Sequence, residues 1–113
     1  MPNFPLSPAR QLGNMLFVSG QIGQQNGQLV SDDITGQTIK ALANVTEILQ
    51  QHGLSLENVI DVTAFLTDQA DYDSFNEAYR NAFNEPFPSR TTVTVKSLPL
   101  GAKVELKIVA EKQ

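Results

Sequence analysis

Three stretches of the chain alternate apolar and polar residues with the two-residue period of a β-strand. Successive side chains of a strand point to opposite sides of the pleated backbone, so the apolar positions of each stretch share one face. These faces comprise Leu16, Val18, Gly20 and Ile22; Ile60, Val62, Ala64 and Leu66; and Val104, Leu106, Ile108 and Ala110. The pattern predicts strands over 15–22, 59–67 and 102–110. Asn26-Gly27 favours a tight hairpin turn, which makes 28–30 a short returning strand.

Two other stretches repeat their apolar residues at helical spacing. Oxygen-bearing side chains at 31–33 precede the first of them, and Gly53 ends it. Asp71 is the predicted cap of the second, which stops before Pro86. The inner faces of these helices are Ile34, Thr38, Ala41, Leu42, Val45, Ile48 and Leu49 in the first, and Tyr72, Phe75, Asn76, Tyr79 and Phe83 in the second.

The order of these elements is hairpin, helix, strand, helix, hairpin. The last hairpin would join a strand over 90–96 to 102–110 through the Pro-Gly connection at 97–101, in an antiparallel pair. Two helices on one face of a mostly antiparallel sheet form an α+β sandwich of two layers, and the 113 residues suit a single domain, 1–113. The other face of the sheet is then either wet or shared between subunits. The proline-rich residues 1–13 are expected to lie extended over the surface.

Composition removes several classes of function. The net charge of −4 and the scattered basic residues argue against a nucleic-acid surface. The chain has no cysteine and one histidine, His52, at the end of the first predicted helix, so we expect no disulfide, no metal site and a solvated histidine near a helix C-terminus. No stretch is long and apolar enough to span a membrane, and the N-terminus lacks the features of a signal peptide. These features favour the cytoplasm.

Arg90 is the first candidate for chemistry. It follows Pro86 and Pro88, which stiffen the entry into the strand, and it lies on the polar face of 90–96. Glu105 lies on the polar face of the next strand, so a hairpin would bring the guanidinium and the carboxylate to one shared surface. Arg90 would then either bind a ligand or form a salt bridge with Glu85 or Glu105. Asn76 interrupts the aromatic stripe of the second helix, either as a structural amide or as a group that reaches a site.

Several segments together resemble the Rid family of reactive-intermediate deaminases, also called the YjgF/YER057c/UK114 family. The resemblance covers nearly the whole chain from Gly13, and the segments occur in the family's order. They are Gly13-Asn14-Met15-Leu16-Phe17-Val18-Ser19-Gly20-Gln21-Ile22, Val62-Thr63-Ala64-Phe65-Leu66-Thr67-Asp68, Phe75-Asn76-Glu77-Ala78-Tyr79, Glu85-Pro86-Phe87-Pro88-Ser89-Arg90-Thr91-Thr92-Val93, Leu98-Pro99 and Val104-Glu105-Leu106.

The resemblance implies a chorismate-mutase-like fold and a homotrimer with clefts between its subunits. It also implies hydrolysis of 2-enamines and 2-imino acids, such as 2-aminoacrylate, to 2-keto acids and ammonium, with no cofactor. A planar guanidinium suits the carboxylate of such a substrate, and a second carboxylate would position the attacking water. Carried over by position, the implied catalytic residues are Arg90 and Glu105, and the implied substrate-binding residues are Arg90, Ser19, Gly20, Asn76 and Thr92.

The N-terminal arm departs from the family pattern. Leu6 stands where relatives often carry a tyrosine, and Lys107 stands where an acidic residue is frequent. The missing hydroxyl keeps an alternative function open, in which a trimer binds a small carboxylate or a protein partner without turnover. A third reading is conversion of a specialised pathway intermediate, as for relatives in pyrimidine breakdown.

Overall fold

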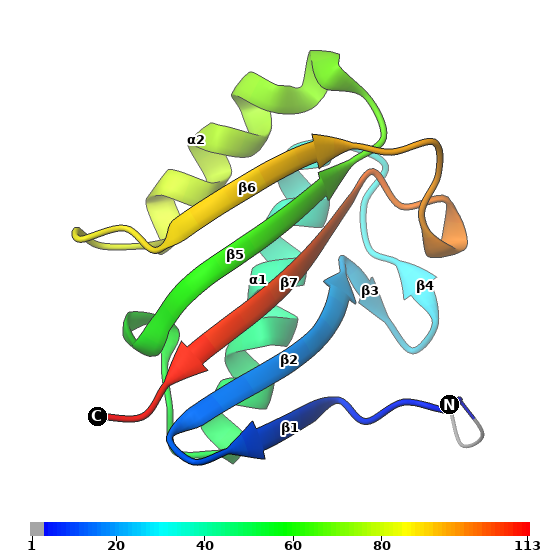
Figure 1. Ribbon diagram of the computed structural model, residues 1–113. Helices are drawn as coiled ribbons and strands as arrows, with labels where there is room; N and C mark the ends of the chain where they lie inside the picture. Colours follow the sequence, from blue (N-terminus) through cyan, green and yellow to red (C-terminus); the bar gives the residue numbers. More distant parts are fainter. Residues whose placement is uncertain (1–3) are drawn as a thin grey trace.

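The computed structural model describes residues 4–113 and contains one five-stranded sheet (Figure 1). The strand order is β1-β2-β7-β5-β6, and every neighbouring pair is antiparallel except β5 and β6. A separate two-stranded hairpin is formed by β3 and β4. The strands are β1 (Ala9–Leu12), β2 (Met15–Ile22), β3 (Gln24–Gln25), β4 (Gln28–Leu29), β5 (Val59–Leu66), β6 (Ser89–Thr94) and β7 (Val104–Glu111).

Two helices, α1 (Ile34–Gln51) and α2 (Tyr72–Ala82), cover one face of the sheet and leave the other face open (Figure 1). Three short 3-10 turns lie at Leu56–Asn58, Gln69–Asp71 and Pro99–Gly101. The core fills the space between the layers, where alternate residues of β2, β5 and β7 meet the inner faces of both helices. The predicted two-layer α+β sandwich is therefore confirmed. Within residues 4–113, no helix is long and apolar enough to cross the bilayer.

Helix α1 begins and ends as its sequence predicts. A side-chain oxygen of Asp33 accepts a hydrogen bond from the backbone N–H of Gly36 at 2.7 Å, which satisfies one of the free amides at the helix start. The chain leaves the helix at Gly53, whose φ of +74° is costly for residues that carry a Cβ. His52 is exposed, and its ring Nδ1 lies 3.0 Å from the carbonyl oxygen of Ile48.

The predicted hairpin between the last two strands is wrong. β6 pairs in parallel with β5, whereas β7 lies between β5 and β2 and does not pair with β6. Helix α2 connects β5 to β6, and a strand-helix-strand crossover produces parallel strands. The segment 95–103 is too long for a tight hairpin turn and carries the chain past β5 to the slot beside β2.

Three local expectations also change. The short strand β4 pairs with β3 rather than with β2, because the Asn26-Gly27 turn closes its own small hairpin. Ile60 is 38% exposed, because an irregularity in the β5–β7 register at this point takes it off the buried face. The side chain of Asp71 forms no capping bond to α2, since the 3-10 turn before the helix is capped by Asp68 instead.

Candidate functional site

Arg90 is directed toward α2 rather than toward the open face of the sheet. It pairs across the strands with Val62, a core residue, so its half-buried side chain enters the helix layer at the sheet edge. The guanidinium carbon lies 4.8, 5.3 and 5.9 Å from the ring centroids of Tyr79, Phe75 and Tyr72, and Nη2 donates a hydrogen bond to the Tyr72 hydroxyl at 3.3 Å. Aromatic faces attract a guanidinium. Three rings of α2 thus hold the guanidinium of Arg90.

A cleft of about 330 Å³ lies beside this guanidinium. Its lining contains two arginines and no acidic side chain among the described residues: Tyr72, Asn76, Tyr79, Arg80, Phe87, Pro88 and Arg90. The pKa of the Tyr72 phenol is lowered from its ordinary value, first by hydrogen bonding with Asn76 and then by the positive charge of Arg90. The cleft is therefore electropositive within an acidic protein and suits an anionic ligand.

Thr92 lies in a neighbouring depression of about 380 Å³ that shares Tyr72 with the Arg90 cleft. Its hydroxyl is buried and has no hydrogen-bond partner in the structure. A buried hydroxyl without a partner costs free energy, and most such groups in proteins are satisfied. The Thr92 hydroxyl is therefore a hydrogen-bond donor without a partner, and it lies on the same side of the sheet as Arg90.

Glu105 lies on the open face of the sheet. It pairs with Phe65, which also pairs with Val93, and this row of side chains faces away from the helices. The carboxylate packs against the backbone of Gly20, where a Cβ would lie 2.8 Å from the carboxylate carbon Cδ. Burial raises the pKa of the Glu105 carboxyl. A carboxylate with a raised pKa suits proton transfer.

Ser19 holds the N-terminal arm beside this carboxylate region. Its hydroxyl donates to the carbonyl oxygen of Ser7 at 2.6 Å, and its backbone N–H donates to the carbonyl oxygen of Pro8 at 2.9 Å. The serine proton is thus committed to the arm, while the oxygen keeps acceptor capacity. The arm places the side chain of Leu6 in solvent, 63% exposed.

The prediction that Arg90 and Glu105 line one shared surface is wrong within a single chain. Arg90, Asn76 and Thr92 belong to the side that faces α2, and Glu105 belongs to the opposite face of the sheet. Paired residues of neighbouring strands point to the same side of a sheet. Arg90 pairs with Val62 and Glu105 pairs with Phe65, and these two residues of β5 lie an odd number of positions apart, so they face opposite sides. The prediction failed because it rested on a β6–β7 hairpin that does not form.

The sequence analysis did not identify two features of the site. One is the set of aromatic side chains of α2 that hold Arg90, and the other is the second arginine of the cleft, Arg80. The signal was present in the spacing of Tyr72, Asn76 and Arg80, which lie four residues apart and so share one stripe of a helix. The predicted inner face of this helix included Tyr72 and Asn76 but not Arg80. In the structure Tyr72 is 40% exposed, because it lies at the rim where α2 overhangs the edge strand.

Known proteins resemble this chain over nearly its full length. The endoribonuclease L-PSP family, which is the YjgF or Rid family, matches residues 1–112. A RutC family protein of Pyrococcus horikoshii is 40% identical over 99% of this chain and 90% of its own length. The chain belongs to the Rid family. The human 2-iminobutanoate/2-iminopropanoate deaminase is 37% identical over 94% of this chain and 79% of its own length.

Solved structures of Rid relatives share the fold described above. Escherichia coli TdcF, determined with bound serine, has a TM-score of 0.91 and 34% identity, covering 98% of this chain and 91% of its own. RidA from an Antarctic Psychrobacter has a TM-score of 0.92 and 30% identity, covering 96% of this chain and 89% of its own.

Among residues 4–113 of the present Rid chain, no three His, Asp or Glu side chains gather into a group that could hold a metal ion.

Proposed function

We propose that this Rid protein hydrolyses reactive 2-imino acids and their 2-enamine tautomers, of the 2-aminoacrylate type, to 2-keto acids and ammonium. The observation that carries the proposal is the Arg90 cleft, in which a guanidinium held by three aromatic rings faces a space whose described lining contains no acidic side chain. A guanidinium pairs with a carboxylate through two parallel hydrogen bonds. The names of relatives as imine deaminases and the serine bound to TdcF agree with a small ligand that carries a carboxylate.

The site is proposed to form between two copies of the chain. Arg90, Asn76 and Thr92 of one copy would meet Ser19, Gly20 and Glu105 of the next, because the two sets lie on opposite sides of one sheet. The open face also carries apolar side chains, with Phe17 40% exposed and Val93 39% exposed beside half-buried residues of β5 and β7. Such a face suits burial against further copies, and we propose a homotrimer.

The proposed mechanism requires positioning and one proton acceptor. Arg90 binds the carboxylate of the imino acid, while Asn76 and the Thr92 hydroxyl are placed to hold neighbouring atoms of the substrate. The Glu105 carboxylate orients a water molecule and takes its proton as the oxygen attacks the imine carbon. Attack gives a carbinolamine, and the proton held by Glu105 passes to its nitrogen. The hydroxyl then gives up its proton as the carbonyl forms, the C–N bond breaks, and the nitrogen takes up this proton and leaves as ammonia, which is protonated to ammonium. No cofactor takes part in this mechanism.

An imine assay with the purified protein tests the proposed function. An amino-acid oxidase releases the imine of 2-aminobutyrate, and the expected result is faster 2-ketobutyrate formation when the protein is present than from spontaneous hydrolysis alone. Free imines hydrolyse in water, so even a modest acceleration counts as activity. An unchanged rate combined with calorimetric binding of 2-ketobutyrate would favour the alternative, a trimer that binds small carboxylates without turnover.

Mixing two inactive variants tests whether the site is shared between copies. Arg90→Ala and Glu105→Gln subunits, unfolded and refolded together in equal amounts, should recover about a quarter of the wild-type activity, because random assembly gives each interface one chance in about four of carrying both native groups. Each variant refolded alone is the control. A mixture as inactive as the separate variants would place both groups in one copy and contradict the shared site.

A further inference from the structure

The cleft that holds Arg90 contains a second guanidinium that the proposed reaction does not use. Arg80 lines this cleft from the last turn of α2, so two of the three arginines of the chain border one space of about 330 Å³. The acidic side chains of α2 line other depressions, Asp73 beside Thr92 and Glu77 between the two helices. No acidic side chain of α2 therefore lines this cleft, and of the acidic residues of α2 only Asp73 acts on the pKa of Tyr72 at its edge.

Helix geometry fixes the direction in which the second charge lies. Tyr72, Asn76 and Arg80 follow one another at intervals of four residues, so they form a stripe along α2. Each interval advances about 6 Å along a helix axis. Arg80 thus extends the cleft from Asn76 toward the C-terminal end of α2, where Phe87 and Pro88 form the facing wall.

Tyr79 provides an independent sign of a ligand in the same cleft. Its side chain is only 5% exposed, yet its hydroxyl has no hydrogen-bond partner in the structure. Burial raises the pKa of this phenol to about 12, although the positive charge of Arg90 opposes the shift. The hydroxyl therefore keeps its proton at neutral pH and remains a donor. Tyr79 and both arginines line this cleft, so an anionic oxygen bound there would give the hydroxyl the partner that the protein does not supply.

We propose that the cleft selects imino acids whose side chain ends in a second carboxylate, with Arg90 binding the carboxylate next to the imine and Arg80, assisted by the Tyr79 hydroxyl, binding the distal one. This inference rests on the proposed function, because it assigns the substrate class of the same site. The reaction is unchanged: water adds to the imine carbon, the C–N bond breaks, and the product is a 2-keto dicarboxylate with ammonium.

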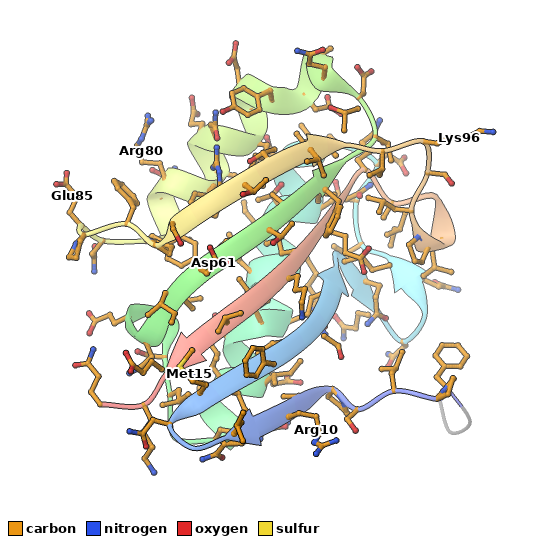
Figure 2. All side chains as sticks on the ribbon, in the orientation of Figure 1. Arg10, Met15, Asp61, Arg80, Glu85 and Lys96 are labelled. Atoms are coloured by element: carbon orange, nitrogen blue, oxygen red, sulfur yellow. The ribbon has the colours of Figure 1, made fainter. Side chains whose placement is uncertain are left out.

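The test compares two imines with two matched variants. An oxidase releases the imine of aspartate or that of 2-aminobutyrate, and kcat/KM is measured for wild type, Arg80→Gln and Arg10→Gln. Arg10 provides the same substitution at the opposite edge of the sheet (Figure 2). Wild type should prefer the dicarboxylic imine, and Arg80→Gln should lose about fivefold or more on it through a higher KM, since the contribution of a partly exposed ion pair is modest.

The same Arg80→Gln protein should hydrolyse the monocarboxylic imine within about twofold of wild type, and high salt should weaken the wild-type preference. Equal losses on both imines, or a wild type without preference, would overturn the inference and leave the proposed function standing. If neither imine is hydrolysed, the proposed function fails, and calorimetry decides the inference instead. The inference is supported if wild type binds oxaloacetate more tightly than 2-ketobutyrate and Arg80→Gln binds the two equally. Equal affinities in wild type overturn it.

Discussion

Arg90→Ala should lower kcat/KM for imine hydrolysis by about 100-fold, because it removes the charged hydrogen bonds that hold the substrate carboxylate. Arg90→Lys should recover only part of this loss, since an ammonium keeps the charge but not the planar pair of donors. The measurement is steady-state formation of 2-ketobutyrate from an imine that an oxidase releases. Full activity in Arg90→Ala would refute the role assigned to the guanidinium.

The control separates ligand binding from stability. Arg90 also packs on the rings of Tyr72, Phe75 and Tyr79, so its removal is expected to lower stability by roughly 1 kcal/mol through lost cation–π contacts. Thermal unfolding of each variant measures that part. Lys96→Gln removes another cation beyond the far end of β6, where the side chain points away from the fold (Figure 2), and should leave the rate unchanged.

Glu105→Gln should lower kcat by about 100-fold and should not destabilise the protein at neutral pH. The amide cannot accept the proton of the attacking water. Burial raises the pKa of the native carboxyl above its ordinary 4.5, so the folded protein binds this proton more tightly than the unfolded chain does. The contribution of this carboxyl to the free energy of unfolding therefore falls as pH rises from about 4.5 through the raised pKa. The Glu105→Gln variant does not titrate, so its stability does not show this fall.

Rates and unfolding over a range of pH test the role of this carboxylate. The wild-type rate should rise with pH through the raised pKa, as the base loses its proton, and the melting temperature of Glu105→Gln at pH 7 should equal or exceed that of wild type. Gly20→Ala is a matched variant that keeps the carboxylate but displaces it, since a Cβ at Gly20 would overlap its position. A Glu105→Gln protein that melts lower and hydrolyses imines normally would make Glu105 a structural residue.

The secondary structure was largely readable from local patterns. The strands β2, β5 and β7 and the helix α1 lie where alternation, caps and helical spacing predict them, and their inner faces are buried except at Gly20 and Ile60. Each of these signals involves residues close in the chain. Gly20 and Ile60 lie at irregularities of the strand pairing, where the side of the sheet that a residue faces changes. The alternation of apolar and polar residues does not reveal such irregularities.

The sequence proposes residues for the candidate site but does not predict how they are arranged. The residues Arg90, Glu105, Ser19, Gly20, Asn76 and Thr92 were assigned by resemblance, and their roles stay predictions. The structure groups three of them beside α2 and the other three near the open face. Alternation indicates which residues share a face of one strand, but not which strand lies beside it, so the pairing of β6 with β5 could not be predicted.

The sequence by itself determined most of the elements, the two-layer class and the family of this protein, because periodicity, capping residues and short motifs are local properties of the chain; strand β1, within the proline-rich arm, was not among them. Only the tertiary structure decided that β7 separates β2 from β5, that Arg90 and Glu105 face opposite sides of the sheet, and that Arg80 joins Arg90 in one cleft. These facts depend on the crossover through α2 and on strand register, which contacts between distant residues establish.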